Sequence, residues 1–449
     1  MTPIDYARHM VELARRAGAE QCDVYVRAYD ESEVTVRLGE TEKLVEAGSK
    51  SLGLRVINGG RTAVCSTADL REESLARLAK ETVELALISA PDEYAGLPSA
   101  DDLARPGGDS LQLYDERLGS LTTDEKVRMA KACEAAAFGV DARITNSEGA
   151  TVTTRSGEVA LANSLGFAAS YPATAIALMV EVMADDADGK KRNDYWFSSE
   201  RSMHRLLAPE EVGRIAAKRA LAQLGAAKVP TRQVPVVFEP MMAVRLLGDL
   251  AACATAGALY RGATFLAGRT GTVLAAPLVT IVDDPLEPGR GGSRPFDGEG
   301  VASRRTALVE DGIFKAFLFD SYTARRMGSR TTGAAARGVE SLPSPAPSNL
   351  ILQPGSTPPD EIVGSVKDGF FVTAVMGQGF NPSTGDFSRG AAGFWIQDGK
   401  LAFPVSEVNI SGRLGDMLAG VDAVGDDLTW FGGMAAPTVR VGQMMVSGL

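Results

Sequence analysis

The sequence predicts an α+β protein in two parts. The N-terminal part is an antiparallel sheet with flanking helices, and the C-terminal part has mainly antiparallel strands in a curled sheet or open barrel. Three observations support this: apolar residues alternate with polar ones in short runs, turn residues separate these runs, and segments with helical spacing flank them. A chain of 449 residues is long enough for two or three domains. A linker-like stretch, Gly225–Arg232, leads us to expect domains at residues 1–225 and 233–449.

The N-terminal segments begin with a helix, Met1–Gly18, which has apolar residues near one face and lacks the long apolar run of a signal peptide. A meander of short antiparallel strands follows, with turns expected at Asp30-Glu31, Gly39-Glu40, Gly48-Ser49 and Asn58-Gly59-Gly60. Its strands are predicted at Cys22–Tyr29, Glu33–Leu38, Glu42–Ala47, Ser51–Ile57 and Thr62–Ser66. Helical spacing returns over Asp69–Ser89.

A second series of strands follows a proline-containing loop, Pro91–Pro106, and a helix, Thr123–Ala137. The predicted strands are Ile144–Ser147, Ala150–Arg155, Glu158–Asn163, Gly166–Tyr171 and Ala173–Met183, with turns at Ser156-Gly157 and Ser164-Leu165-Gly166. A charged stretch, Ala184–Trp196, is expected to be exposed. A helix from Pro209 to Leu224 completes this half.

The C-terminal half begins with a strand, Pro235–Phe238, and an apolar helix from Pro240. Short strands with glycine turns dominate from residue 278 onward, which favours a curled sheet or a barrel. They are predicted at Thr280–Val282, Ser303–Glu310, Gly312–Leu318, Phe371–Met376, Gly393–Asp398, Lys400–Pro404, Ser406–Ile410 and Pro437–Met445. Two short helices are expected at Ser321–Met327 and Pro358–Val366.

The composition argues against several classes of protein. A formal net charge of −11 disfavours binding to nucleic acid or to an anionic membrane, because both need a basic face. No run of about 20 apolar residues predicts a membrane span. The four cysteines, Cys22, Cys65, Cys133 and Cys253, form no C-x-x-C pair. Their spacing favours reduced thiols in the cytoplasm over a disulfide framework or a zinc site.

Motifs for self-contained catalysis are absent from the sequence. There is no P-loop, no H-E-x-x-H and no G-x-S-x-G nucleophile turn. The two histidines, His9 and His204, are far apart, so the sequence supports neither a Ser-His-Asp triad nor a histidine-rich zinc site. A freestanding hydrolase would have to use Cys253 or a serine, and Cys253 has no base or cation nearby in the sequence to lower its pKa.

Two glycine-dense segments, Pro288–Gly300 and Met376–Gly393, suit tight turns and close backbone approach. One interpretation is that they are turn-rich loops with a structural role alone. The other is that they line a groove, in which Arg290, Arg294 and Arg389 would bind a carboxylate or a peptide carbonyl.

Ordered motifs run through the whole C-terminal half. They are Ile281–Pro285, Gly291–Gly300, Asp320–Arg325, Thr331–Gly333, Pro347–Asn349, Met376–Gly379, Thr384–Trp395, Pro404–Glu407 and Val424–Asp427. In order and rough spacing these motifs resemble the TldD/PmbA family. The N-terminal half agrees more loosely, through Gly48–Gly53 and Ala63–Asp69.

The resemblance is to one branch of that family. The TldD-like branch carries H-E-x-x-x-H on a helix, with a distant cysteine, as a metal site for peptide hydrolysis; the PmbA branch, also called TldE, lacks these ligands and pairs with the other. The equivalent helix is expected at Ala254–Leu259, with Ala254, Thr255 and Leu259 at the motif positions. None of these residues can bind zinc, and Trp430–Thr438 contains no cysteine.

The resemblance therefore implies a metal-free chain with no catalytic residue and no cofactor of its own. It implies a TldD-like metallopeptidase subunit as partner and unfolded peptide as substrate, although a homodimer is also possible. The residues that we expect along a peptide groove are Tyr260, Arg261, Arg294, Gly377, Gln378 and Arg389. The family's older description as a modulator of DNA gyrase leaves a regulatory binding protein as the alternative.

Overall fold

The computed structural model describes residues 1–105, 110–187 and 189–448. The N-terminal half is built around one antiparallel sheet with the strand order β3-β2-β1-β4-β5-β6. Its strands are β1 (Gln21–Arg37), β2 (Glu40–Asn58), β3 (Arg61–Thr67), β4 (Ile144–Asn163), β5 (Ala168–Asp185) and β6 (Lys191–Glu200). The predicted α+β class, with an antiparallel N-terminal sheet, is confirmed.

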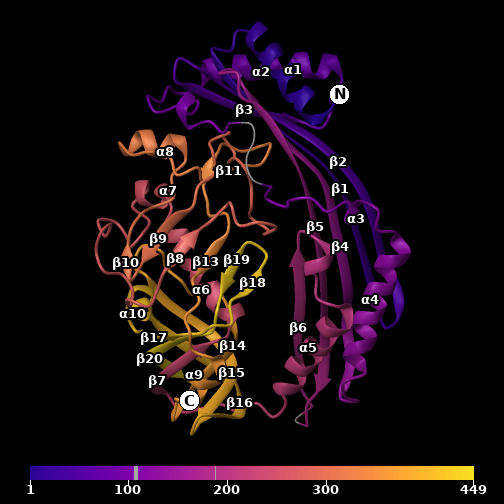
Figure 1. The fold of residues 1–449 in the computed structure, drawn as a ribbon, viewed down its shortest axis with the longest axis vertical. Coiled ribbons are helices and arrows are strands. Elements are labelled where there is room, and N and C mark those ends of the chain that lie inside the picture. Colours follow the sequence, from indigo (N-terminus) through magenta and orange to yellow (C-terminus); the bar gives the residue numbers. More distant parts are fainter. Residues whose placement is uncertain (106–109, 188, 449) are drawn as a thin grey trace.

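Helices cover this sheet in two groups (Figure 1). At one end, α1 (Pro3–Arg16) and α2 (Glu72–Ile88) share a core with β1 and β2. At the other end, α4 (Thr123–Phe138) and α5 (Pro209–Ala222) share a core with β4 and β5, and the short α3 (Glu116–Gly119) lies beside them. Both α1 and α4 begin with a capping box, from Thr2 and Thr122, which satisfies backbone N–H groups at the helix start.

The meander of short strands is wrong, because several expected turns lie inside long continuous strands. Asp30 pairs with Gly48 on one side and with Ser156 on the other, in the middle of β1. Gly157 is needed for close approach rather than for a turn: a Cβ there would lie 2.0 Å from the backbone oxygen of Ala28. The true hairpin turns are at Leu38-Gly39 and Gly59-Gly60, where φ is positive, close to the positions predicted from Gly39 and Asn58-Gly59-Gly60.

Most described residues of the charged stretch Ala184–Trp196 are exposed or partly exposed, as expected. Its second part enters β6, which pairs with β5 from Lys191 onward. Trp196 is partly buried and packs edge-on against Phe431, with 6.0 Å between the ring centroids. The expected linker lies between α5 and β7, whereas the division into domains 1–225 and 233–449 stays a prediction.

Two further six-stranded sheets form most of the C-terminal half. One has the order β10-β9-β8-β13-β19-β18, and the other has the order β16-β15-β14-β7-β20-β17. Within the second sheet β16 also pairs with β20, so five strands close into a barrel rather than the open one expected. The strands are β7 (Arg232–Phe238), β8 (Ile281–Asp283), β9 (Thr306–Glu310), β10 (Ile313–Phe314), β13 (Leu350–Leu352), β14 (Asp368–Met376), β15 (Asp386–Gln397), β16 (Lys400–Arg413), β17 (Val421–Val424), β18 (Thr429–Phe431), β19 (Met434–Ala436) and β20 (Val439–Ser447).

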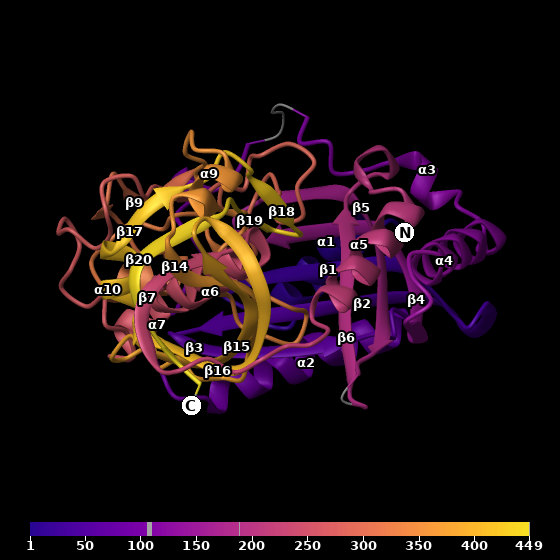
Figure 2. The same ribbon diagram turned by 90° about the horizontal axis from the view of Figure 1, so that it is seen from below.

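An apolar helix, α6 (Pro240–Cys253), lies in the core that these sheets share (Figure 2). The predicted helices Ser321–Met327 and Pro358–Val366 are found as α8 (Ser321–Arg326) and α9 (Pro359–Gly364). The expected strand Gly312–Leu318 shortens to β10, and the strands Lys400–Pro404 and Ser406–Ile410 merge into β16. The remaining elements are α7 (Ala256–Tyr260), α10 (Leu414–Ala419) and the small pair β11 (Ala335–Ala336) and β12 (Ser344–Pro345).

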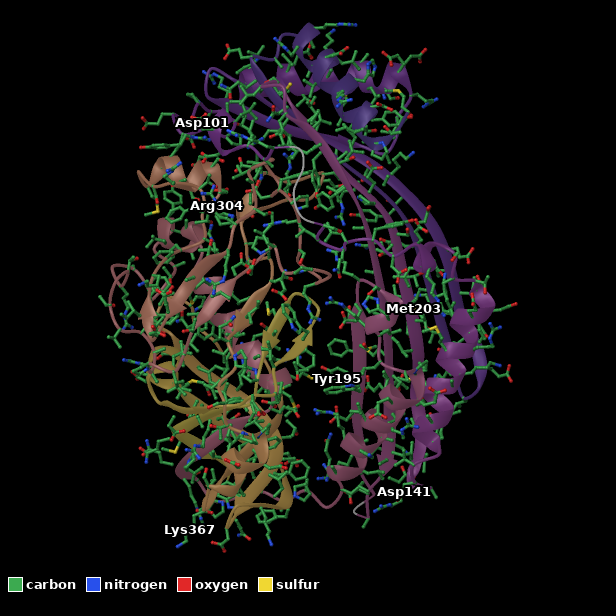
Figure 3. The ribbon with its side chains drawn as sticks, in the orientation of Figure 1. Asp101, Asp141, Tyr195, Met203, Arg304 and Lys367 are labelled. Carbon is green, nitrogen blue, oxygen red and sulfur yellow. The ribbon has the colours of Figure 1, made fainter. Side chains whose placement is uncertain are left out.

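The two halves meet through buried charges and aromatic rings. Asp23 of β1 forms ion pairs with Arg55 of β2 and with Arg337 of the C-terminal half, whose Nη1 lies 2.6 Å from its Oδ1. All three side chains are at most 5% exposed. Further along the interface, Tyr195 of β6 points toward the C-terminal half (Figure 3), and its hydroxyl lies 3.9 Å from the sulfur of Met241.

The ion pairs of Asp23 give a first prediction. Asp23→Ala leaves Arg337 without its ion-pair partner and Arg55 with only the longer contact to Glu299, so two cations stay buried with too little compensation. We expect the free energy of unfolding, measured with urea, to fall by about 3–5 kcal/mol. Glu33→Gln, which breaks the exposed Lys43–Glu33 pair, is the control and should cost less than about 1 kcal/mol. Equal losses in the two variants would contradict this view of the interface.

Candidate functional site

The expected helix at Ala254–Leu259 is not continuous. Helix α6 ends at Cys253, Thr255 has extended backbone angles, and α7 starts at Ala256. The hydroxyl of Thr255 accepts a hydrogen bond from the N–H of Ala258, as a helix N-cap does. Leu318 holds the break from the other side, since its N–H donates to Ala254 O and its carbonyl accepts from Ala256 N, both at 2.8 Å. The prediction of one helix is therefore wrong, and the capping threonine is the sequence signal for the break.

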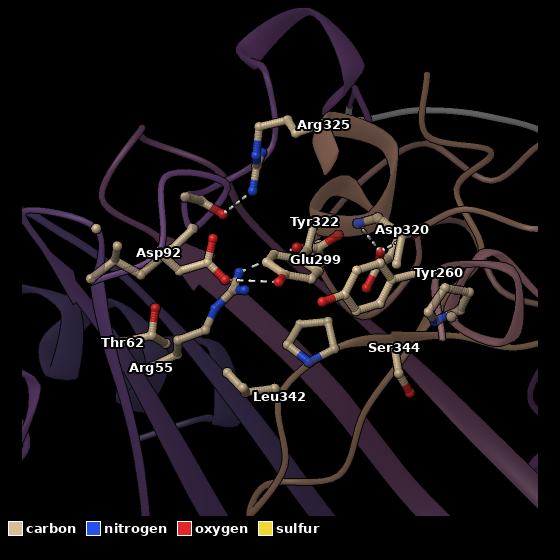
Figure 4. Close-up of a pocket in the computed structure, with 18 of the residues that line it drawn as sticks. Arg55, Thr62, Asp92, Tyr260, Glu299, Asp320, Tyr322, Arg325, Leu342 and Ser344 are labelled. Carbon is tan, nitrogen blue, oxygen red and sulfur yellow. Dashed lines mark hydrogen bonds and ion pairs between the residues drawn. The ribbon is translucent and has the colours of Figure 1, made fainter. Parts of the chain in front are cut away.

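A cavity of about 450 Å³ lies next to α7, where the two halves meet (Figure 4). The N-terminal half supplies Arg55, Thr62 and Asp92 on one side, and the C-terminal half supplies Tyr260 and Asp320 on the other. Apolar residues line much of the remaining wall: Ile57, Ala90, Ala95, Leu342, Pro343 and Pro345. Its volume falls in the range of about 300–1,000 Å³ that small-molecule sites occupy.

Two buried carboxylates reach this cavity. Glu299 is 1% exposed; one of its oxygens accepts from the N–H of Ser321 at 2.8 Å, and the other lies 3.4 Å from Nη2 of Arg55. Asp320 is also 1% exposed and caps α8, because its Oδ1 accepts from the N–H and the hydroxyl of Thr323. Burial first, and then the charge of Glu299, raise the pKa of the Asp320 carboxyl.

The loop between β8 and β9 fixes Glu299 in place. Asp297 is buried, and its Oδ1 accepts hydrogen bonds from the N–H groups of Glu299 and Val301 at 2.8 and 3.0 Å. Its Oδ2 accepts from the N–H of Ala335 at 3.0 Å. These bonds hold the backbone of residues 297–301 in a tight loop. The loop restricts the direction in which the Glu299 side chain can extend. Burial and the neighbouring Glu299 charge raise the pKa of Asp297.

Aromatic rings and arginines frame the open side of the cavity. Arg326 lies over the ring of Tyr260, with 4.0 Å between its guanidinium carbon and the ring centroid, and over Tyr94 at 5.1 Å. The Tyr322 hydroxyl donates to Asp92 at 2.7 Å. Arg261 is exposed and forms no ion pair with any residue that the structure describes.

Arg325 belongs to the same wall, and each of its three side-chain nitrogens donates a hydrogen bond to backbone. Its Nε, Nη1 and Nη2 donate to the carbonyl oxygens of Tyr94, Leu97 and Gly96, at 2.7, 3.0 and 2.9 Å. The guanidinium therefore ties α8 to the loop of the N-terminal half and holds this wall of the cavity in place.

The predicted groove residues fall in three separate places. Tyr260 and Arg261 line the cavity. Gly377 and Gln378 lie in an exposed loop after β14, and Arg389 lies beside this loop, where it pairs with Asp249 at 2.8 Å. Arg294 lies apart from both groups: its Nε and Nη2 are buried and lack a hydrogen-bond partner among the described residues. The structure therefore brings five of the six predicted residues together in two groups, Tyr260 with Arg261, and Gly377 with Gln378 and Arg389. Arg294 belongs to neither group.

Sequence reasoning missed the charged residues of the cavity. Glu299 and Asp320 both lie in motifs that carry the family resemblance, Gly291–Gly300 and Asp320–Arg325. These motifs are the sequence signal that could have identified the two residues as part of a site. No such signal marks Arg55 and Asp92, because they come from a strand and a loop of the other half of the chain.

Three domain models of one family match consecutive parts of the chain. They describe PmbA/TldA metallopeptidases and match domain 1 at residues 22–86, the central domain at 116–224 and the C-terminal domain at 231–448. A metalloprotease PmbA homolog of Haemophilus influenzae is 33% identical over 439 residues, which cover 98% of this chain and 94% of the relative. The chain belongs to the TldD/PmbA family.

Other members of the family agree over nearly the whole length. The metalloprotease PmbA of Escherichia coli O157:H7 is 32% identical over 415 residues, covering 92% of this chain and 89% of that protein. A Bacteroides thetaiotaomicron structure, described as a modulator of DNA gyrase, superposes with a TM-score of 0.92 at 28% identity, covering 99% and 98% of the two chains. TldE from Thermococcus kodakarensis has a TM-score of 0.89 at 21% identity, covering 98% and 99%, and shows the shared fold.

The metal that the family name implies does not fit the residues present in this TldD/PmbA chain. Within residues 1–105, 110–187 and 189–448, no three His, Cys, Asp or Glu side chains are grouped so that they could hold a metal ion. His9 pairs with Glu72 at 2.8 Å on the N-terminal helices, and His204 is exposed on a different segment. At the motif positions, Ala254 is fully buried and Leu259 packs against the core.

Cys253 is no better placed as a nucleophile. Burial raises the pKa of its thiol to about 12, and its sulfur lies 3.7 Å from the carbonyl oxygen of Pro382. A thiol with so high a pKa is almost entirely protonated at neutral pH, and the thiolate is the reactive form.

No helix in the described ranges has the length and apolar character needed to cross a bilayer.

Asp283, in the motif Ile281–Pro285, gives a prediction about pH. Burial raises the pKa of its carboxyl to about 6, although Oδ1 accepts from both the N–H and the hydroxyl of Ser348. In the unfolded chain the same group has a pKa near 3.8. The folded state therefore binds the proton more tightly, and the contribution of Asp283 to stability falls as pH rises from about 4 through 6.

Asp283→Asn keeps an acceptor for Ser348 but removes this titration. Between pH 5 and 7.5 the wild type should lose about 1 kcal/mol of unfolding free energy relative to the variant, in urea titrations at the two pH values. Asp141→Asn is the matched control, because the pKa of that exposed carboxyl is lowered to about 2 and it does not titrate in this range. A constant difference between wild type and Asp283→Asn would contradict the assignment.

Proposed function

We propose that this chain is a metal-free, non-catalytic subunit of a cytoplasmic metallopeptidase complex. In this proposal a TldD-like subunit holds the metal and cleaves unfolded peptides, while this chain forms part of the enclosing wall. The observation that carries it is the break at Ala254-Thr255. The chain matches proteins named metalloproteases over nearly its full length, yet the positions expected to hold metal are a buried alanine, a helix cap and a partly buried leucine packed against the core.

Relatives support a pairing of two unlike subunits. Haemophilus influenzae has both the PmbA homolog that is 33% identical to this chain and a TldD homolog that is 24% identical over 437 residues. Two related chains kept side by side in one organism are consistent with a heterodimer in which only one carries the metal. A homodimer is the competing arrangement, and native mass in the presence and absence of a TldD-like subunit separates the two.

Peptide contacts belong to the same proposal. Tyr260 and Arg261 at the cavity, and Gly377, Gln378 and Arg389 around the loop after β14, are two exposed or partly exposed surfaces that a peptide can reach. The interior position of Arg294 favours a different role, as a countercharge whose field lowers the pKa values of Asp283 and Asp297 against the effect of burial.

Reconstitution tests the subunit role. We expect a mixture of this chain, a purified TldD-like subunit and a disordered peptide such as reduced casein fragments to cleave at least about tenfold faster than either protein alone, because binding the peptide between two walls orients it at the metal. A chelator should abolish cleavage, and this chain alone should contain well below one zinc per molecule. The proposal fails if cleavage is as fast without this chain, or if this chain alone carries stoichiometric zinc.

Two alternatives give different results in the same preparation. A freestanding hydrolase would keep its activity in chelator and lose it in Cys253→Ala, which the burial of Cys253 argues against. A regulatory role is favoured by the description of the Bacteroides thetaiotaomicron relative as a modulator of DNA gyrase. It would be supported if a pull-down with this chain recovered gyrase and no TldD-like subunit.

A further inference from the structure

Asp320 is a buried acid with no positively charged partner among the described residues. Its Oδ1 is used by the helix cap, whereas Oδ2 takes part in no hydrogen bond with the residues that the structure describes. No Lys, Arg or His nitrogen among these residues lies within 4 Å of its carboxylate. A carboxylate that is 1% exposed and has no cation within 4 Å among the described residues is costly to keep ionised, so a positively charged or proton-donating group from outside would stabilise it.

The nearby arginines do not supply that group. Arg55 is shared between Asp23 and Glu299, and Arg325 donates its N–H groups to three backbone carbonyls. The carboxylate of Glu299 lines the same cavity, so the inner end of the space is rich in acceptors and poor in donors. The rings of Tyr260 and Tyr322 also line it. Arg326 already lies over one face of the Tyr260 ring, 4.0 Å from its centroid, and donates to the Tyr322 hydroxyl, so these rings contribute mainly apolar surface.

We propose that this cavity binds the free amino terminus of a short peptide, with the ammonium group on Asp320 and Glu299 and the first side chain against the apolar wall. An ammonium group fits better than a metal ion, because no third donor residue completes a coordination shell in the described part of the chain. Leu342, Pro343 and Ile57 provide the apolar surface for a side chain. Arg261, exposed and unpaired at the open side, is placed to meet the carboxylate of a dipeptide.

This inference rests on the proposed function for its choice of peptides as ligands, but its test uses this chain alone. A subunit that fails to stimulate cleavage can still bind a dipeptide, and one that binds no dipeptide can still stimulate cleavage. The two ideas can therefore fail separately.

Calorimetric titration at pH 7.5 with leucyl-leucine, its N-acetyl form and its C-terminal amide tests the site. We expect leucyl-leucine to bind in the micromolar to millimolar range and acetylation to weaken binding at least about tenfold, because a hydrogen bond to a charged group is lost. Asp320→Asn keeps the cap oxygen for Thr323 but removes the charge, and should weaken leucyl-leucine to a similar extent. Arg261→Gln should weaken leucyl-leucine and leave the amide unchanged.

The matched control is Asp115→Asn, the same substitution at the cap of α3, where the side chain accepts from the N–H of Arg117 outside this cavity. It should bind leucyl-leucine as the wild type does. Equal binding of free and acetylated dipeptide, unchanged binding in Asp320→Asn, or no heat of binding up to about 10 mM would each overturn the proposal. If Asp320→Asn does not fold, the acetylated ligand and Arg261→Gln still decide the question.

Discussion

The two ion pairs of Asp23 are the constraint on which the rest of this structure depends. They join neighbouring strands of the N-terminal sheet to a residue 314 positions later in the chain, in a place that water does not reach. Buried charges add little stability compared with a well-packed apolar core, but a charge placed out of register is heavily penalised. The pairs therefore set where the sheet lies against the C-terminal half. The cavity depends on that placement, because its two sides come from different halves.

Close backbone contact supports the same arrangement. A Cβ on Gly53 of β2 would lie 1.9 Å from the carbonyl oxygen of Val339, so only glycine lets the loop after Arg337 lie flat on the sheet. That loop continues into Leu342 and Pro343, which form the apolar wall of the cavity. Gly53 ends one of the N-terminal stretches that resemble the family, and this contact gives its presence a physical reason. The ion pair to Arg337 and the contact at Gly53 thus act on neighbouring residues of one loop.

Local signals predicted local structure well. Helices α1, α4, α8 and α9 could be predicted from apolar spacing and capping residues, as could the hairpins at Gly39 and Gly59. The long strands could not, because Gly48 and Gly157 have the composition of turns. Both nevertheless pair inside the sheet, and Gly157 closely approaches the backbone of the neighbouring strand. The candidate site was less predictable still. Asp320 has the sequence signature of an ordinary helix cap, and its lack of a cation depends on Arg55 and Arg325, which are bonded elsewhere.

The break between α6 and α7 explains why the positions expected to hold metal do not come together on one helix in this chain. Two metal-binding side chains on one helix need an unbroken helical backbone between them, so that both can reach the same metal ion. Here the chain turns at Ala254-Thr255, and the hydrogen bonds from Leu318 hold the turn on the side away from the cap. Placing histidines at 254 and 259 would put one in the fully buried core and the other on a separate helix. Backbone as well as side chains therefore keeps these positions from forming a metal site in the described part of this chain. The space beside α7 is a cavity lined by carboxylates and aromatic rings, and these are the residues on which the proposed ammonium site depends.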